Sequence, residues 1–191
     1  MQQFGLFEII ERINILIRAE ERKKCTALGL QPVHLQVLQY LSCCNRFSNT
    51  TVALTQYLGR TMGSVSQTVS LLEKNGLIKK IPDIKDHRVV KLELTNEGRK
   101  ILELALPDEL YIRASSLLGT EEAIKQCTDY FNITLNALQK AYELKSFGIC
   151  HNCQFHTKIG DGSVCSFYKE RLSKKDSEKI CKDHTVLSWW Q

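Results

Sequence analysis

The sequence lacks the features of several protein classes. It has no run of about 18 apolar residues, which a membrane-spanning helix would need. It has no H-E-x-x-H motif, no phosphate-cradling glycine loop and no nucleophile elbow, which are short signatures of common enzyme sites. Its start, Met1 to Phe4, has neither the basic residues nor the apolar core of a secretion signal. We therefore expect a cytoplasmic protein that is not an enzyme and has no membrane partner.

The composition is that of an ordinary folded protein. Of the 191 residues, 43% are hydrophobic and 25% are charged, which is enough apolar material for a core. The net charge of +5 permits a polyanionic partner without requiring one. Eight cysteines are present, and without a secretion signal we expect reduced thiols or metal ligands rather than disulfides. Cys25, Cys43, Cys44 and Cys127 fall in helical context, where a free cysteine is commonly a small buried apolar residue.

Apolar periodicity, caps and turn residues predict a mostly helical chain with one hairpin. The helix signals cover residues 4–27, 32–41, 50–58, 62–75, 95–118 and 120–146. Pro107 should kink or split the fifth of these near Leu106. Two strands, 77–81 and 89–94, flank a tip of turn residues at 82–88.

Two of these helices are short and joined by a tight, glycine-containing turn, which is the signature of a helix-turn-helix. In the second, Val65, Val69 and Leu72 recur at helical spacing and predict a face that packs on the core. The opposite face is small and polar, as a helix that enters the major groove requires. Its predicted DNA-contacting residues are Ser64, Ser66, Gln67, Thr68, Ser70 and Lys74. Gln67 is the best candidate for reading a base, because glutamine can pair bidentately with adenine.

The hairpin carries basic charge next to that helix. Residues 74–100 hold eight Lys or Arg and four Asp or Glu. Basic side chains there would neutralise phosphates and release counterions. The DNA-contacting residues predicted in the hairpin are Lys80, Lys85, His87 and Arg88. Arg88 could reach the minor groove, where narrow A-tracts attract arginine.

Three motifs in this region occur in the order and spacing of the MarR family. Residues 71–78, Leu-Leu-Glu-Lys-Asn-Gly-Leu-Ile, resemble the end of that family's recognition helix and the start of its wing. Residues 83–88, Asp-Ile-Lys-Asp-His-Arg, are similar to its Asp-x-x-Asp-x-Arg wing, and residues 94–98, Leu-Thr-Asn-Glu-Gly, to the exit from that wing. The resemblance spans about residues 4–146. It assigns a DNA contact to Arg88, whereas His87 stands where another basic residue is common.

The resemblance implies a fold, partners and a role. The fold is mainly α with a small two-stranded β wing: a winged helix-turn-helix with long dimerisation helices. The implied partners are a second copy of the chain and a pseudo-palindromic double-stranded DNA operator, and the implied role is transcription regulation, by family analogy repression. The faces expected to pair carry Ile10, Ile13, Ile17, Ile124, Phe131, Leu135 and Leu138. The expected parts are a dimerisation helix at 1–30, a DNA-binding domain at 31–98, further dimerisation helices at 99–147 and a cysteine-rich tail at 148–191.

The resemblance does not extend to the tail, which has its own cysteine pattern. The spacing is Cys150-x2-Cys153-x11-Cys165-x15-Cys181-x2-His184. A C-x-x-C pair and two further thiolates would complete the tetrahedral site that structural zinc prefers. A segment of about 40 residues can bury little core, so a metal would supply folding energy.

The identity of the centre stays open on this pattern. One C-x-x-C pair with two isolated cysteines also suits a [4Fe-4S] cluster, whereas His151, His156 or His184 could replace a cysteine at zinc. We favour zinc; without a metal, the cysteines would be buried or redox-active thiols. Two functions follow. The tail could gate DNA binding in response to a metal or redox signal, or it could be only a structural staple in a regulator that responds to a small-molecule effector.

Overall fold

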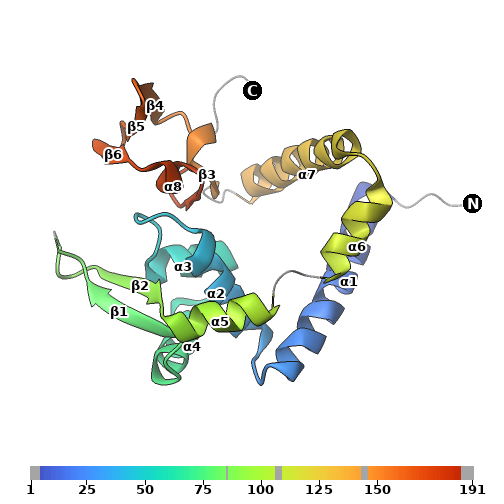
Figure 1. The fold of residues 1–191 in the computed structure, drawn as a ribbon, viewed down its shortest axis with the longest axis horizontal. Coiled ribbons are helices and arrows are strands. Elements are labelled where there is room, and N and C mark those ends of the chain that lie inside the picture. The colour runs from blue at the N-terminus through green and yellow to red at the C-terminus, as the bar shows by residue number, and fades with distance from the viewer. Residues whose placement is uncertain (1–4, 85, 106–108, 143–145, 186–191) are drawn as a thin grey trace, which may run out of the picture.

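The computed structural model describes residues 5–84, 86–105, 109–142 and 146–185 (Figure 1). Its longer helices are α1 (Leu6–Ala27), α2 (Pro32–Cys43), α3 (Thr51–Leu58), α4 (Met62–Lys74), α5 (Asn96–Ala105), α6 (Glu109–Leu118) and α7 (Glu121–Ala141). The strands β1 (Ile78–Pro82) and β2 (Val90–Leu94) lie between α4 and α5. The tail holds β3 (Gly148–Ile149), β4 (His156–Ile159), β5 (Gly162–Cys165), β6 (Glu170–Leu172), β7 (Ile180–Cys181), the 3-10 turn η1 (Cys150–Asn152) and α8 (Lys174–Ser177). The predicted fold class, mainly α with a two-stranded wing, is confirmed.

Threonine caps begin both short helices of the helix-turn-helix. The Thr50 hydroxyl oxygen accepts a hydrogen bond from the backbone of Ala53 at 3.2 Å, and that of Thr61 accepts one from Ser64 at 3.3 Å. Gly59 ends α3 with a φ of 60°, a left-handed conformation that glycine adopts without strain. The turn between α3 and α4 is therefore three residues long, from Gly59 to Thr61.

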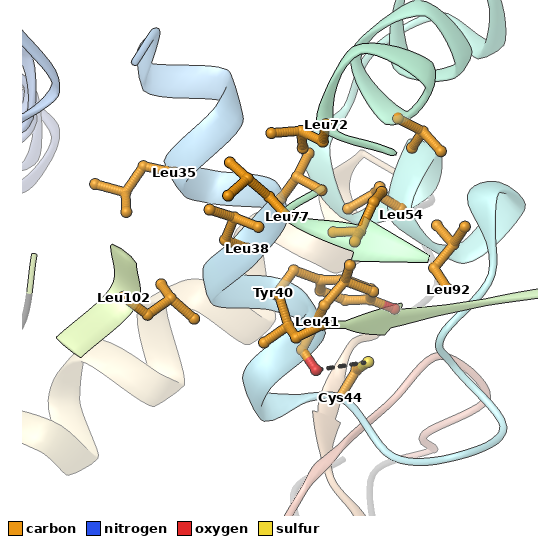
Figure 2. Packing of buried hydrophobic residues seen from close by; sticks show 14 of the residues in the cluster. Leu35, Leu38, Tyr40, Leu41, Cys44, Leu54, Leu72, Leu77, Leu92 and Leu102 are labelled. Atoms are coloured by element: carbon orange, nitrogen blue, oxygen red, sulfur yellow. Dashed lines mark hydrogen bonds between the residues drawn. The ribbon is translucent and has the colours of Figure 1, made fainter. Parts of the chain in front are cut away.

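The main core lies where α2 meets α3, α4, the wing and α5 (Figure 2). Its largest fully buried side chains include Tyr40, Leu38, Leu54, Leu72, Ile78 and Leu92. The Tyr40 hydroxyl donates to the Ser48 carbonyl at 2.8 Å, which satisfies two polar groups inside the core. Cys25 and Cys44 are buried in this core, as predicted, and Cys43 and Cys127 are half-buried. The helix pair and the wing are thus fixed to one another through α2.

The wing is an antiparallel pair whose register runs from Ile78 opposite Leu94 to Pro82 opposite Val90. Both strands begin one residue later than the sequence predicted. Its exit is tightly packed, because a Cβ at Gly98 would lie 2.1 Å from the Leu77 carbonyl oxygen. The Thr95 hydroxyl oxygen accepts from the Gly98 backbone at 3.0 Å and caps α5. A glycine at this position therefore lets α5 sit against the start of β1.

Three helices extend from this body and leave their apolar faces open within one chain. In Figure 1, α1 and α6 are drawn away from the wing, and α7 runs from α6 towards the tail. Cys25 is the only buried residue of α1, and α6 and α7 have none among their described residues. The predicted break near Leu106, at Pro107, lies outside the described residues, and the structure describes α5 up to Ala105 and α6 from Glu109. Among the helices described here, none combines the length and the apolar character that crossing a membrane requires.

Candidate nucleic-acid interface and cysteine core

One face of α4 is polar and open to solvent. Ser66, Gln67, Ser70 and Lys74 are exposed, whereas Val65, Val69 and Leu72 on the other face are at most 1% exposed. Ser64 is half-buried beside the Thr61 cap, and its backbone N–H is taken by that cap. The exposed set offers hydroxyl, amide and ammonium groups, which is the donor and acceptor chemistry that base edges and phosphates recognise.

The position of Thr68 differs from the predicted set of DNA-contacting residues. The sequence placed it on the polar face, but it is 9% exposed and its hydroxyl donates to the Ser64 carbonyl at 3.0 Å. The reason is its position three residues after Val65, which puts it on the side of the helix that packs inward. Its hydroxyl satisfies the helix backbone instead of facing a ligand.

The wing places two basic side chains in defined positions. The Lys80 ammonium lies 2.7 Å from the Glu73 carboxylate and 3.4 Å from the Ser70 hydroxyl, so it joins the wing to the exposed face of α4. The Arg88 guanidinium donates to both carboxylate oxygens of Asp86, at 2.9 and 3.0 Å, and hydrogen bonds from Arg88 lower the pKa of that carboxyl. Even so, 91% of the Arg88 side chain is exposed. The arginine is therefore oriented at the tip while remaining accessible.

Two further predicted wing residues and one unpredicted basic residue lie in the same region. His87 is exposed, as predicted, and Lys85 lies outside the described residues. The sequence reading missed Arg60, an exposed residue in the turn between α3 and α4. A basic residue just before the N-terminus of a recognition helix is a signal that could have included it, because phosphates are commonly contacted there.

The tail forms a second, small core that contains Cys150, Cys165 and Cys181, and its fourth cysteine, Cys153, is buried as well. Cys150 begins η1 and Cys153 follows its last residue, and the Cys153 backbone N–H donates to the Cys150 carbonyl at 3.1 Å. Cys165 ends β5, in the sheet β4–β5–β6, and Cys181 ends β7, which pairs with β3. All four are free thiols and 3–7% exposed. The fold thus brings the predicted metal-ligating cysteines together.

The environment of these sulfurs is apolar, with a few donors directed at them. Burial, followed by the proximity of Cys181, Cys165 and Cys153, raises the pKa of Cys150 to about 12. The Thr185 backbone N–H donates to the Cys153 sulfur at 3.4 Å. Within the described residues, no three or more His, Cys, Asp or Glu side chains stand ready to hold a metal ion. Thiolates are the donors that a thiophilic metal takes, but the four thiols as they stand in the described residues do not form a group that could hold one.

The three tail histidines are engaged in other contacts. His151 Nδ1 lies 3.2 Å from the Ser177 carbonyl oxygen, and His156 Nε2 lies 3.2 Å from the Ser177 hydroxyl. His184 Nδ1 lies 3.1 Å from the Ser146 hydroxyl, and its buried Nε2 has no hydrogen-bond partner. Burial lowers the pKa of His184, which keeps the ring neutral. One ring nitrogen each of His151 and His156 thus contacts Ser177, whereas His184 Nε2 stays without a hydrogen-bond partner, so the histidine alternative stays a prediction.

The tail also contacts the DNA-binding domain, through residues 44–49, which we call the α2–α3 loop. The Asn45 backbone N–H donates to the Ile180 carbonyl at 2.9 Å, and the Lys182 backbone N–H donates to the Ser48 hydroxyl at 2.9 Å. Phe47 stacks on Tyr168 with ring centroids 4.0 Å apart. Arg46 reaches Glu170, the Arg171 carbonyl and Asp176 at distances of 2.5–3.3 Å. No local sequence signal pointed to this loop, because its partners lie far along the chain.

Comparison with known proteins gives a fold but no close relative. No protein-family model matches the chain, and no curated protein matches it. Among solved structures, a complex of S. aureus MepR with DNA aligns with a TM-score of 0.59 and 23% identity, covering 71% of this chain and 99% of that one. The apo and reduced forms of E. coli MarR align with TM-scores of 0.57 and 0.55 at 19% identity, over 70% and 71% of this chain and 99% of theirs. This chain therefore has the winged helix-turn-helix fold of MepR and MarR, with an additional part that these neighbours lack.

Proposed function

We propose that this protein is a sequence-specific DNA-binding transcription regulator. The observation that carries the proposal is the exposed polar face of α4, which Lys80 links directly to the basic wing. In this arrangement Gln67 reads a base edge in the major groove, and Arg88 contacts the backbone or the minor groove beside it. The similarity in fold to MepR, which has been crystallised with DNA, supports the same use of these elements here.

We propose that the protein acts as a homodimer on a pseudo-palindromic operator, and that it represses. The support for the dimer is the apolar surface that α1, α6 and α7 leave uncovered. Its large exposed side chains include Phe7, Ile9, Ile15, Leu16, Leu117, Tyr130, Phe131, Ile133 and Leu135. Faces of this kind generally mark an association site, and two-fold symmetry would place two α4 helices one DNA turn apart.

Selection of binding sites from a pool of random DNA duplexes would test the proposal. Full-length protein should enrich one palindromic motif, and fluorescence anisotropy should show tighter binding to it than to a shuffled duplex. Lys74→Ala should weaken this binding. Lys158→Ala, which removes the same charge from an exposed position on β4, should leave it unchanged. Equal losses from the two variants, or no enriched motif, would contradict the proposed interface.

We propose that Cys150, Cys153, Cys165 and Cys181 together hold one metal centre, zinc rather than a [4Fe-4S] cluster, and that this centre gates DNA binding. The burial of all four thiols and the proximity of the other three to Cys150 support it. Zinc would supply a fixed tetrahedral cross-link for a segment with little core of its own. Protein purified without oxygen should be colourless and contain about one zinc per chain. Visible absorption together with about four irons per chain would contradict zinc and indicate a [4Fe-4S] cluster.

A second candidate function has a structural observation in its favour. A hollow of about 1490 Å³ lies between α3, α7 and the tail, and Tyr57, Ile133, Phe147 and Ile180 are among its lining residues. A small-molecule effector bound there would contact the helix-turn-helix and a dimerisation helix at once. An effector can be tested on wild type and on a variant with all four tail cysteines changed to serine. If it released DNA equally well from both, the tail would have only a structural role and no part in regulation.

A further inference from the structure

One residue of the α2–α3 loop is bonded to the tail and to the wing at the same time. The Arg46 guanidinium lies 3.2 Å from the Glu170 carboxylate and 3.3 Å from the Asp176 carboxylate. It also donates to the Arg171 carbonyl at 2.5 Å. The backbone carbonyl of Arg46 accepts from the Lys91 ammonium of β2 at 3.0 Å. A single loop residue therefore joins the tail to a strand of the wing.

The Asp176 end of this contact is shielded from water. Only 12% of the Asp176 side chain is exposed. Its carboxylate also accepts from the Ser173 hydroxyl at 2.7 Å, within the capping box that begins α8. A shielded carboxylate that loses its cation is left with an uncompensated charge, which costs more free energy than the loss of an exposed ion pair. Removal of the Arg46 guanidinium should therefore destabilise this part of the tail.

Phe47, the next residue of the loop, contributes to the small core of the tail. Its ring stacks on Tyr168 with centroids 4.0 Å apart and planes 8° apart, and the Arg46 guanidinium lies 4.8 Å from the Phe47 centroid. Phe47 also packs against the buried cluster that contains Leu172 and three of the tail cysteines. Because a segment of about 40 residues buries little apolar surface, an aromatic ring from outside it adds substantially to its core. The tail thus depends on the loop for part of its packing.

The loop depends on the tail in return. It consists mainly of turns, and two of its polar residues, Asn45 and Ser48, are 1% and 0% exposed because the tail lies over them and bonds to them. On its other side, Leu92 of β2 donates its backbone N–H to the Asn49 carbonyl at 2.7 Å and accepts from Asn49 Nδ2 at 3.2 Å. If the tail left, the loop would face water on one side, and β2 would rest on a less ordered support.

We propose that Arg46 and Phe47 are positioning residues for the wing: they dock the tail on the α2–α3 loop, and the docked tail holds the wing in the orientation that binds DNA. Lys91 extends this path, since its ammonium lies 3.8 Å from the Asp83 carboxylate at the start of the wing tip. The tail then acts as a brace for β2. The contacts that carry this role are those of the loop and do not involve the cysteine sulfurs.

An exchange of charge across the contact tests the proposal on full-length protein. Arg46→Glu places a carboxylate beside those of Glu170 and Asp176 and should undock the tail. Adding Glu170→Arg restores opposite charges across the contact and should dock the tail again. Lys158→Glu is the matched control, because it changes the net charge as Arg46→Glu does, at an exposed position on β4 that β5 separates from β6.

Hydrogen exchange measures docking and its effect on the wing without DNA. Arg46→Glu should speed exchange in residues 148–185 and in β2, whereas α4 should exchange as in wild type, because its buried residues belong to the main core. The double variant should exchange as wild type does. Faster exchange in the tail with unchanged exchange in β2, or an equal rise in β2 and α4, would overturn the coupling. If Arg46→Glu does not fold, Arg46→Gln and Lys158→Gln replace the two single variants.

The effect on DNA rests on the proposed function and has its own readout. With a selected duplex, Arg46→Glu should lower affinity about 5- to 150-fold, the usual range for coupling between two sites, and the double variant should restore most of it. Lys158→Glu should leave affinity nearly unchanged. Equal losses in the two single variants would reject the proposal, since the loss would then come from net charge. If wild type binds no duplex, the proposed function fails while hydrogen exchange still tests the docking.

Discussion

Gly98 provides a sharp test of how α5 is packed against the wing. A Cβ at this position would meet the Leu77 carbonyl oxygen at 2.1 Å and the Leu77 carbonyl carbon at 3.1 Å, and both are backbone atoms that cannot rotate away. The same carbonyl accepts the Thr95 backbone N–H at 3.1 Å, so the clash also strains the start of the helix. Gly98→Ala should gain up to about 1 kcal/mol from helix propensity but lose more by overpacking, typically 1–3 kcal/mol and occasionally more. We expect a net loss of roughly 1–3 kcal/mol.

Thermal unfolding measures this loss against a matched control. At about 2–4 °C per kcal/mol for a chain of this size, Gly98→Ala should lower the Tm by roughly 2–12 °C. Gly63 also lies in a helix, and a Cβ there would meet nothing within 4 Å. Gly63→Ala should therefore leave the Tm unchanged or raise it slightly. If the two variants unfold at the same temperature, the result would contradict the close packing of Gly98 against the Leu77 carbonyl.

Further predictions concern DNA affinity, the core and pH. Gln67→Ala should cost about 1–3 kcal/mol of binding to a selected duplex and leave the dependence of log affinity on log salt concentration unchanged. Arg88→Ala should reduce the slope of that dependence by about 0.9, because one phosphate contact is lost. Anisotropy across salt concentrations measures both, and identical effects of the two variants on the slope would contradict the assigned contacts. Tyr40→Phe leaves the buried Ser48 carbonyl without its 2.8 Å donor and should lower the free energy of unfolding in urea by about 1–3 kcal/mol, and an unchanged midpoint would refute it. Burial lowers the pKa of His34 below its ordinary value of 6.5, so the unfolded chain takes up the proton first. The free energy of unfolding should therefore fall as pH drops below 6.5, and His34→Gln should lessen that fall; an equal fall in the variant would argue against this assignment.

The helix-turn-helix and its wing could be predicted from local sequence alone. The spacing of Val65, Val69 and Leu72 determines which side of α4 packs inward, and the caps and glycines determine where the short helices begin and end. Gln67 followed from that helix spacing, whereas Arg88 followed from the basic hairpin and the family resemblance, and both are exposed. Thr68 is polar yet buried, because its spacing of three from Val65, and not its polarity, decides its side of the helix.

The connection between the tail and the DNA-binding domain was decided only by the tertiary structure. The cysteine spacing by itself marked Cys150, Cys153, Cys165 and Cys181 as a set, because ligand spacing is a local property of the chain. Nothing near Asn45 and Ser48 in the sequence indicates that they bond to Ile180 and Lys182, since a buried polar contact between distant segments has no periodicity or spacing of its own. Local order follows from propensity and pattern along the chain, whereas the partner of a buried side chain is fixed only when distant segments pack together.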